Sequence, residues 1–558
     1  MRIRNLSLAA FAALLTLAPL GCGGGSSTPA PTLTAADLAA DEAAMAAIDT
    51  VWSSAQGQSL YDQAQTVLAA MQANTRFTDS GISSDNTVWG VLQDGTLFAV
   101  GTNDVGTNDV ITPLALSPRR FAVPSTDIPA ASGELPASST AYVFNALEAN
   151  RNVPNAAIAA NLSAAGYNVT SSTGSLADWQ SVSNAGLLFN ASHGFVLQPN
   201  HDGVEVYFLQ TSDIYQKGDM TYNALRAAKV LAVIEVNLLG TSAAPGVPPV
   251  NSGSAFYWTF SSAFLKSPGM FANNSLMFNM GCSGMSSSGI TFANSLSTTN
   301  GLSVYGGWSK PSITYDGDET SSFFFDRALG LNQFAPVDPT NPPPDDWAGI
   351  LTIMQNSNRA SGVGYNLATS VPADSEKSPI AVFAFQNPGG SALTTIIPSI
   401  AGFTVDLPSN TLTLQGSFGS GQGSVTLDGD PLTVNAWSNS SITTVLPSAS
   451  SGKLQVFSPL SLESNQFPYT EPNPWIGTWV GSVTSTCGYY SGPLTISISS
   501  TGGDGLQFAL SGGFSSYTGT WSGNIAYSSD NSVVFTLSGN TMSAVESNSC
   551  QDGTYHRQ

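Results

Sequence analysis

Basic residues are scarce in this chain of 558 residues. Lys and Arg together number 16, against 37 Asp and Glu, which gives a formal net charge of −21 at pH 7. Proteins that bind nucleic acid neutralise phosphates with clustered Lys and Arg, so the composition argues against a nucleic-acid partner. An acidic surface also repels anionic membranes, so any attachment to a membrane needs a covalent or apolar anchor.

Histidine and cysteine are even scarcer, and they limit the available chemistry. The histidines are His193, His201 and His556, and the cysteines are Cys22, Cys282, Cys487 and Cys550. A metal site built from several imidazoles is therefore nearly excluded, and no CxxC or HExxH motif occurs. No Walker loop or dinucleotide-binding glycine pattern follows a strand. We expect neither a metal nor a cofactor.

Long apolar runs are also missing, apart from residues 6–20 at the N-terminus. Arg2 and Arg4 precede this run, which is too short to span a bilayer comfortably and ends at Cys22. It resembles a bacterial lipoprotein signal, which implies a signal peptide over 1–21, an acylated Cys22 and a flexible tether over 22–33. An ordinary secretory signal is the alternative. Either signal predicts export, and the lipoprotein signal predicts an outer-membrane or cell-surface location.

What the chain does contain is enough apolar residues, 42% of the total, for several folded domains. Residues 34–138 predict a helix over about 33–76, a hairpin over 87–100 with an Asp94-Gly95 turn, and a Pro-rich loop region. Residues 139–395 alternate buried strands with helices, one of them over about 256–266. This alternation predicts a mainly parallel sheet with helices on both faces.

Two strand ends in this α/β region carry reactive side chains. Phe189-Asn190-Ala191 leads into Ser192-His193-Gly194, and Phe278-Asn279-Met280 leads into Gly281-Cys282-Ser283-Gly284. Ligands of open parallel sheets bind beyond the carboxyl ends of the strands, where a His and a Cys can meet. The imidazole can activate the thiol and protonate a leaving amine. The backbone N–H groups of Gly194 and Cys282 can stabilise an oxyanion.

At this point the chain resembles the caspase-like cysteine peptidases, the clan CD group that includes caspases, gingipains and CHAT proteases. These enzymes place a His-Gly after one strand and a Gly-Cys or Ala-Cys after the next. Residues 292–308 resemble the helix, strand and Trp that follow the Cys in CHAT proteins, and the likeness covers about 140–330. It implies that Cys282 is the nucleophile, that His193 is the general base and acid, and that Gly307 and Trp308 lie near the substrate.

The residue that such an enzyme would recognise before the cleaved bond stays open. Metacaspases carry an Asp two residues before the Cys, where this chain has Met280. Caspases that cleave after Asp need arginines, and this region has few of them: Arg151, Arg226 and Arg327. Carboxylates that could select a basic side chain follow Trp308: Asp316, Asp318 and Glu319. Asp318 is more simply explained as a helix cap.

Purely structural roles for Cys282 and His193 are the alternatives to the catalytic hypothesis. A free Cys at a strand end is often a small core residue, and a His there is often only hydrogen-bonded. The sequence His201-Asp202-Gly203 predicts a turn, and His556 lies in the terminal tail. Neither is a strong candidate for the general base.

The region after residue 395 reads as all-β, with Gly-rich turns. Residues 396–471 resemble the IPT/TIG immunoglobulin-like domain through Ile400-Ala401-Gly402-Phe403, Leu414 to Gly419 and Trp437-Ser438, which implies a spacing or binding role. Residues 472–558 predict a small barrel or sandwich. Cys487 and Cys550 lie near its two ends, and export permits the disulfide that we expect between them. Two free thiols are the alternative.

The sequence therefore predicts a multidomain chain with a caspase-like α/β domain, an Ig-like sandwich and a small β domain. The expected function is that of an exported, lipid-anchored cysteine endopeptidase acting on a protein or peptide substrate. A catalytically inactive relative is the main alternative, in which the β domains bind a surface protein or a glycan. A structural protein of the cell envelope is the third hypothesis. Calcium dependence has no support beyond the acidic loops.

Overall fold

The computed structural model describes most of the chain after residue 33. The described residues are 34–55, 58–101, 133–147, 154–199, 202–239, 251–265, 267–312, 314–334, 337, 345–357, 366–370, 381–406, 409–447, 451–470, 473–502, 505–512, 516–522, 524–546 and 550–557. The predicted signal, the predicted acylation site Cys22, Arg151 and His201 lie outside them. Among the described residues, no helix is long and apolar enough to cross a membrane.

The N-terminal region contains two helices rather than the single predicted one. These are α1 (Ala35–Ser54), capped by Thr34, and α2 (Leu60–Ala73), capped by Ser59. Each cap hydroxyl accepts a backbone N–H three residues on, from Asp37 or Asp62, so Ser59 starts a second helix by satisfying its free donors. The predicted hairpin is present as β2 and β3, with the Asp94 carboxylate accepting the Thr96 N–H at 2.7 Å in the turn.

The hairpin belongs to a seven-stranded sheet of order β1-β2-β3-β9-β10-β8-β7. Its strands are β1 (Phe77–Ile82), β2 (Val88–Leu92), β3 (Leu97–Val100), β7 (Gly194–Leu197), β8 (Val206–Ile214), β9 (Leu231–Leu239) and β10 (Asn251–Ser261). Because β3 pairs in parallel with β9, residues on the two sides of the predicted boundary at 138 and 139 share one sheet. A short helix, α5 (Asn223–Ala227), precedes β9.

The helix predicted over 256–266 is wrong. Most of that stretch is strand β10, followed by the short 3₁₀ turn η1 (Ser262–Phe264). The run Phe256-Tyr257-Trp258-Thr259-Phe260 consists of aromatic and β-branched residues, which pack well on a pleated surface. Trp258 lies buried on one face beside Tyr215 and Tyr222, so tertiary packing favours the strand.

The second sheet is the predicted, mainly parallel one, of order β13-β14-β12-β11-β6-β4-β5. Its strands are β4 (Thr140–Asn145), β5 (Asn168–Ser172), β6 (Ala185–Ala191), β11 (Phe271–Asn279), β12 (Val304–Trp308), β13 (Thr369–Ser370) and β14 (Ala381–Gln386). The run from β5 to β12 is parallel, and β14 is antiparallel to β12.

Helices cover both faces of this sheet, as expected. They are α3 (Asn155–Ala164), α4 (Leu176–Ser181), α6 (Ser287–Ser295), the π-turn η2 (Leu296–Asn300), α7 (Thr314–Ala328) and α8 (Trp347–Asn356). Apolar residues of α3, α7 and α8 share one core with the alternate strand residues Val143, Phe189 and Phe278. Those of α4 and α6 pack on the opposite face.

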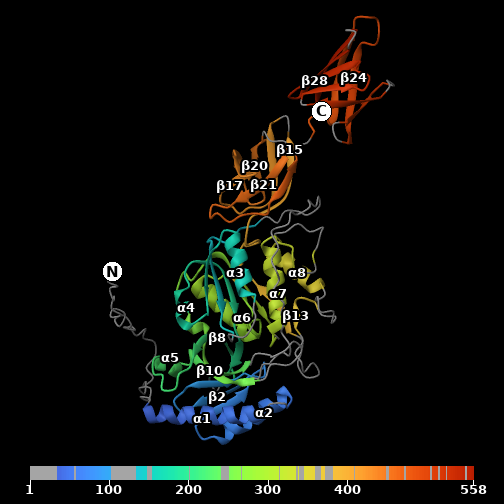
Figure 1. The fold of residues 1–558 in the computed structure, drawn as a ribbon. Helices are drawn as coiled ribbons and strands as arrows, with labels where there is room; N and C mark the ends of the chain where they lie inside the picture. The colour runs from blue at the N-terminus through green and yellow to red at the C-terminus, as the bar shows by residue number, and fades with distance from the viewer. Residues whose placement is uncertain are drawn as a thin grey trace, which may run out of the picture.

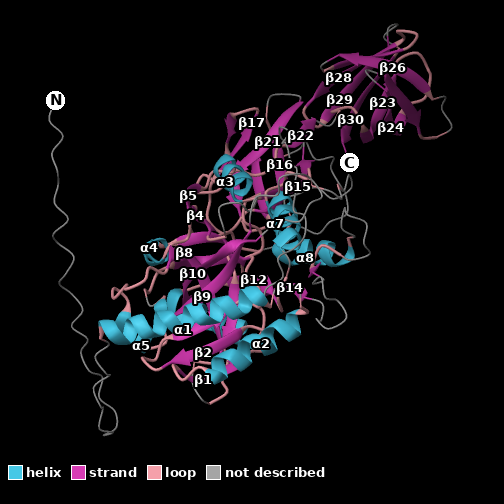
Figure 2. Ribbon diagram, turned by 60° about the horizontal axis from the view of Figure 1, so that its bottom comes forward, coloured by secondary structure: helices cyan, strands magenta, loops and turns pink. Residues whose placement is uncertain are grey.

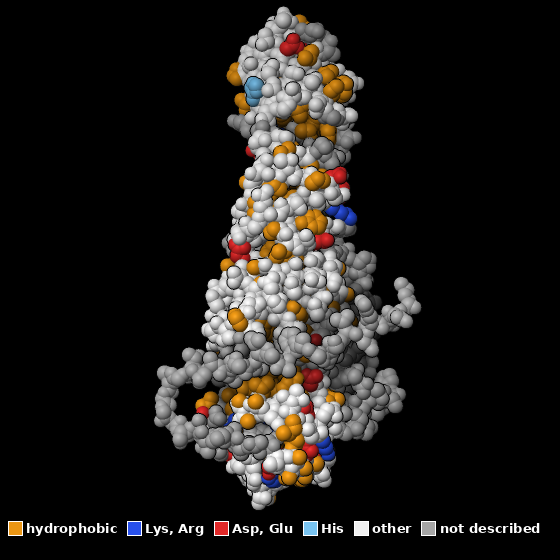
Figure 3. All heavy atoms as spheres, turned by 90° about the vertical axis from the view of Figure 1, so that its left-hand side faces the viewer, with side chains coloured by type: hydrophobic (Ala, Val, Ile, Leu, Met, Phe, Trp, Pro, Cys, Tyr) orange, Lys and Arg blue, Asp and Glu red, His pale blue; other side chains and the backbone are white. Residues whose placement is uncertain are grey.

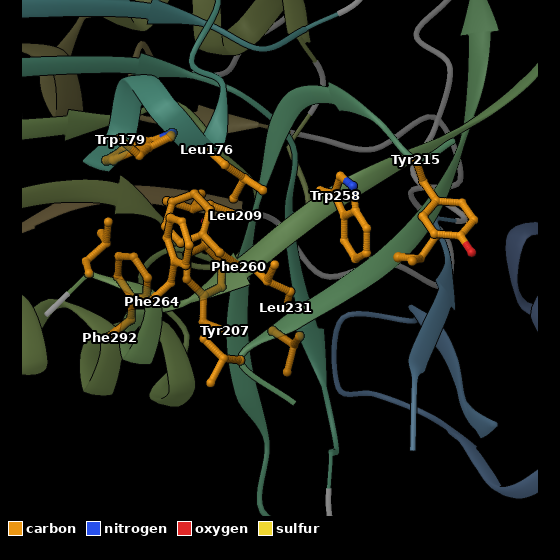
Figure 4. Packing of buried hydrophobic residues seen from close by; sticks show 14 of the residues in the cluster. Leu176, Trp179, Tyr207, Leu209, Tyr215, Leu231, Trp258, Phe260, Phe264 and Phe292 are labelled. Carbon is orange, nitrogen blue, oxygen red and sulfur yellow. The ribbon is translucent and has the colours of Figure 1, made fainter. Parts of the chain in front are cut away.

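One continuous core joins the two sheets. The Trp179 ring of α4 lies edge-on to Phe144 of β4 at 5.0 Å and to Phe260 of β10 at 5.1 Å between ring centroids. Figure 4 shows this junction, with Trp179, Leu209 and Phe260 from different elements turned toward one another. The same core includes Trp52 of α1, so the N-terminal helices and both sheets form one body.

Two β units follow this α/β body (Figures 1 and 2). The first is a sandwich of sheets β15-β16-β20-β19 and β18-β17-β21-β22, and the second is a closed barrel, β23 to β30. The sandwich strands are β15 (Ser399–Asp406), β16 (Thr411–Ser417), β17 (Ser424–Leu427), β18 (Asp430–Leu432), β19 (Val434–Trp437), β20 (Ser441–Val445), β21 (Ser451–Phe457) and β22 (Phe467–Thr470). The barrel strands are β23 (Gly477–Ser485), β24 (Gly492–Gly502), β25 (Gly505–Leu510), β26 (Tyr517–Ser522), β27 (Ile525–Ser528), β28 (Val533–Ser538), β29 (Thr541–Glu546) and β30 (Gln551–Arg557).

Candidate active site

The candidate site lies where β6 and β11 end. These strands are parallel neighbours, and their last paired residues are Asn190 and Asn279. The Met280 N–H donates to the Asn190 carbonyl at 2.8 Å, which continues the pairing beyond the strands. His193 and Cys282 each follow their paired Asn by three residues. Equal offsets on adjacent parallel strands bring the two segments side by side, as the sequence predicts.

Close backbone contact confirms that the two segments touch. An added Cβ at Gly194 would lie 2.2 Å from the Cys282 carbonyl oxygen and 2.2 Å from the Tyr207 hydroxyl, so only glycine fits at this position. A Cβ at Gly281 would lie 3.2 Å from the Ser192 carbonyl oxygen. Both reactive side chains are buried, His193 with 8% and Cys282 with 6% of its surface exposed. The site in this conformation is closed.

A buried amide network lies beneath the two segments. The Asn190 amide donates to the Asn279 side-chain oxygen at 2.9 Å, and that oxygen also accepts the Gly281 N–H at 3.2 Å. The Asn279 amide donates to the hydroxyls of Tyr207 at 3.0 Å and Tyr305 at 2.8 Å. Burial raises the pKa of both phenols, and for Tyr207 the nearby Tyr305 and Cys282 raise it further. Neutral phenols and amides therefore fix the segments without adding charge.

These two asparagines were not among the expected site residues, although the sequence carries a signal for them. Both strands end in the same pattern, Phe-Asn followed by a small or apolar residue, at 189–190 and 278–279. A buried polar residue at the same place on two apolar strands indicates a shared hydrogen-bonding role, because an unpaired buried amide is costly.

The thiol of Cys282 is held by the segment that follows β12. Its Sγ accepts the Ser312 N–H at 3.3 Å and donates to the Ser312 carbonyl at 3.5 Å. The Lys310 carbonyl accepts the Ser283 N–H at 3.2 Å. We call residues 309–312 the covering segment, because Lys310 and Ser312 contact the backbone and the thiol of the Cys282 segment.

A buried carboxylate from the N-terminal region also supports the site. Asp85 lies between β1 and β2, and one of its oxygens accepts the Val196 N–H at 2.9 Å and the Ser283 hydroxyl at 3.3 Å. It therefore contacts both the segment after His193 and the segment after Cys282. Ser283 has a φ of 58°, in the left-handed region that non-glycine residues rarely adopt. Burial raises the pKa of Asp85 to about 6.

Asp85 could not be selected from sequence. Ser-Asp-Asn is an ordinary turn sequence, and the Asp85 carboxylate does accept the Thr87 N–H at 3.0 Å as in an Asx turn. Its contacts with residues 196 and 283 depend on the pairing of the N-terminal strands with later ones.

The predicted substrate contacts lie in the core. Trp308 has no exposed surface and packs against Phe383 of β14 at 5.4 Å between ring centroids. Gly307 is buried beside Tyr305 and Gly284. A role for either in substrate binding stays a prediction.

The predicted cap at Asp318 is wrong, because α7 begins four residues earlier, at Thr314. Asp316, Asp318 and Glu319 are all buried within α7. Gly317, between them, packs against Met280, since an added Cβ would lie 2.9 Å from the Met280 side chain. In this part of α7, the contact with Met280 is therefore made at Gly317.

The described arginines of this region are occupied elsewhere. Arg226 donates to Asp94 at 2.8 Å, and Arg327 donates to Asp326 at 2.5 Å. His556 lies in β30 of the barrel, with Nδ1 3.3 Å from the Thr541 hydroxyl. Cys487 and Cys550 form the predicted disulfide, and Cys282 is a free, buried thiol. Among the described residues, no group of three or more His, Cys, Asp or Glu could hold a metal ion.

Comparisons with known proteins add little. No protein-family model matches the chain, and no curated protein matches it. Among solved structures it is similar to a crystal structure of gamma-CGTase from alkalophilic Bacillus clarkii, with 14% identity and a TM-score of 0.13. That match covers 31% of this chain and 29% of the other. A likeness this weak carries no argument about fold or function.

Proposed function

We propose that the chain is an exported cysteine endopeptidase of the caspase-like type, anchored to a membrane through an acylated Cys22. Cys282 is the nucleophile and His193 is the general base and acid. The observation that supports this proposal is the pairing of β6 with β11, which gives both groups the same offset beyond adjacent strand ends.

The order of the parallel strands also supports the proposal. From the sheet edge, β5-β4-β6-β11-β12 corresponds to the second, first, third, fourth and fifth strands of this sheet along the chain. In doubly wound sheets of this order, ligands bind beyond the carboxyl ends of the strands. His193 and Cys282 both lie at that edge.

The proposed chemistry is acyl transfer to sulfur and then to water. His193 takes the Sγ proton, and the thiolate attacks the substrate carbonyl carbon. The N–H groups of Gly194 and Cys282 stabilise the oxyanion. Collapse of this intermediate breaks the C–N bond, and His193 gives its proton to the leaving amine. A water deprotonated by His193 then hydrolyses the thioester, which releases the acid and restores the thiol.

Peptide cleavage tests this proposal. The full-length chain is incubated with a peptide library that varies the residue before the cleaved bond, with and without calcium. We expect cleavage by the wild type, loss of cleavage in Cys282→Ala, and unchanged cleavage in the control Ser287→Ala, an exposed residue nearby. Cleavage that persists in Cys282→Ala would contradict the proposal.

A second candidate function is a non-catalytic surface protein that binds a protein or glycan. The burial of Cys282 under Ser312 favours it, since an inactive domain has no need to open. Absence of cleavage with every peptide, together with a stable fold, would favour this candidate.

A further inference from the structure

The C-terminal barrel has the geometry of a container for one small molecule. Each of its eight strands is antiparallel to the next, and β30 returns to pair with β23, which closes the barrel. The interior of a barrel with eight strands is wide enough either to be filled by side chains or to hold one small ligand.

The two ends of this barrel differ. At one end the Trp479 indole donates to the Trp475 carbonyl at 3.0 Å, and the Arg557 guanidinium lies 5.4 Å from the Trp479 ring centroid. Both Trp side chains are fully buried, so this end is filled. Toward the other end lies a cavity of about 130 Å³. A cavity of about 150 Å³ lined by apolar residues can bind benzene, so this space suits a single ring.

The walls of the cavity are mostly apolar and aromatic. They include Leu494, Ile496, Tyr517, Phe535 and Tyr555. Phe508, Tyr517 and Phe535 form a stacked layer, with centroids 5.2 Å apart between Phe508 and Tyr517 and 4.6 Å between Phe508 and Phe535. Burial raises the pKa of Tyr517, and it raises that of Tyr555 to about 12. Both phenols are therefore neutral at pH 7.

A carboxylate also faces this space. Glu546 lines the cavity, and its Oε2 is buried with no hydrogen-bond partner among the residues that the structure describes. A buried acceptor without a partner is costly, and a charged one more so. A ligand that brings a cationic donor to this atom would remove that cost.

The rim of the cavity is fixed by a covalent link. The disulfide joins Cys487, in the β23–β24 connection, to Cys550, which directly precedes the lining residue Gln551. The Thr486 N–H donates to the Cys550 carbonyl at 2.9 Å across the same connection. A rim held in place before binding reduces the entropy lost when a ligand enters.

We propose that this cavity binds a small aromatic amine, with its ring against Tyr517 and Phe535 and its ammonium group on Glu546. The volume excludes a long acyl chain, because the far end of the barrel is filled by Trp479. The carboxylate excludes anions of the same shape. The proposal does not depend on the peptidase function of the α/β body.

Calorimetric titration of the full-length chain with 2-phenylethylamine tests this proposal. 3-Phenylpropionate and 2-phenylethanol are the anionic and neutral comparison ligands of similar size. We expect the amine to bind about tenfold more tightly than either, which corresponds to about 1.4 kcal/mol, since a charge-assisted hydrogen bond is stronger than a neutral one.

Variants separate the charge from the cavity. Glu546→Gln should weaken amine binding about tenfold and leave 2-phenylethanol unchanged, whereas the control Asp552→Asn, an exposed carboxylate on β30, should change neither. Ala544→Leu, which fills the cavity, should abolish binding of all three ligands, with the thermal unfolding of the barrel showing that it remains folded. No binding of the amine by the wild type, or equal binding of amine and anion, would overturn the proposal, as would unchanged amine affinity in Glu546→Gln.

Discussion

At the scale of single residues, buried carboxyl groups are the least expected feature of this molecule. Charged side chains are only 9% of the chain, and yet Asp85 and Glu235 are both buried inside the α/β body. Asp85 contacts both segments of the candidate site. Glu235 lies on β9 opposite α1, where the nearby Asp49 accepts the Ser254 hydroxyl at 2.7 Å.

We expect Asp85→Ala to lower the free energy of unfolding by about 1–3 kcal/mol, because the Val196 N–H loses its buried acceptor. It should also slow labelling of Cys282 by peptide ketones, since the segments after His193 and Cys282 lose their common support. Rates of labelling by a small alkylating reagent provide the second readout. A positioning role predicts slower peptide labelling with unchanged or faster alkylation. Equal slowing with both reagents would contradict that role.

We expect the docking of α1 to depend on pH through Glu235. Burial, and then the neighbouring Asp49 carboxylate, raise the pKa of Glu235 to about 10 from an ordinary value of 4.5. The folded state therefore binds a proton that the unfolded state releases, so this contribution to stability is present below about pH 4.5 and is lost as the pH rises toward 10. Glu235→Gln, which mimics the protonated group, should remove that loss.

Hydrogen exchange of peptides from α1 and β9 measures this pH-dependent loss of stability. We expect the protection of Glu235→Gln relative to the wild type to increase about tenfold for each pH unit between pH 6 and pH 8.5, because each pH unit in this range corresponds to about 1.4 kcal/mol. Comparison at equal pH cancels the intrinsic exchange rates. A ratio that stays the same at both pH values would rule out this role for Glu235.

At the scale of elements, local pattern predicted most of the parallel sheet. Strands such as 141–144, 187–191 and 276–280 are continuous apolar runs, which indicate burial on both faces. Local pattern did not predict the structure correctly where pairing between distant strands determines it. Residues 256–260 became a strand because β9 and β8 lie on either side of them, and nothing local specifies that the N-terminal hairpin pairs with β9.

In the candidate site too, some residues could be predicted from local sequence and others could not. The segments with His193 and Cys282 follow strands that local sequence predicts, so their meeting could be expected. Asp85 and Ser312 come from other parts of the chain, and their contacts with these segments depend on tertiary packing. The disulfide was predictable because Cys487 and Cys550 lie near the two ends of one β unit.

The connection between β21 and β22 fixes the sandwich to the α/β body. Leu462 in this connection is fully buried in the core beneath α3, and the Glu463 N–H donates to the Ala165 carbonyl at 3.0 Å. An added Cβ at Gly166 would lie 2.3 Å from the Ser461 carbonyl oxygen. The sandwich therefore shares part of its packing with the body.

We expect Leu462→Ala to destabilise this junction by about 2–5 kcal/mol, the usual range for truncating a buried Leu. In calorimetry the sandwich and the body should then unfold at more widely separated temperatures than in the wild type. The control Val445→Ala removes an exposed apolar residue of β20 and should leave the transitions unchanged. If Leu462→Ala and Val445→Ala changed the separation of the two unfolding temperatures equally, a structural role for this connection would be contradicted.

At the scale of the whole molecule, the body, the sandwich and the barrel follow one another along an elongated shape (Figure 1). Figure 3 shows a face on which neutral and apolar side chains predominate and charges are few. In this arrangement the sandwich separates the body with the proposed active site from the barrel with the proposed ligand cavity.

The proposed function depends on the activation of Cys282 by His193. The most direct measurement is labelling of the full-length chain by a peptide acyloxymethyl-ketone library, comparing wild type, Cys282→Ala, His193→Ala and the control His556→Ala. We expect labelling at Cys282 in the wild type and in His556→Ala, and its loss in the other two variants. Labelling of Cys282 that is as fast in His193→Ala as in the wild type, or no labelling with any peptide with or without calcium, would contradict it.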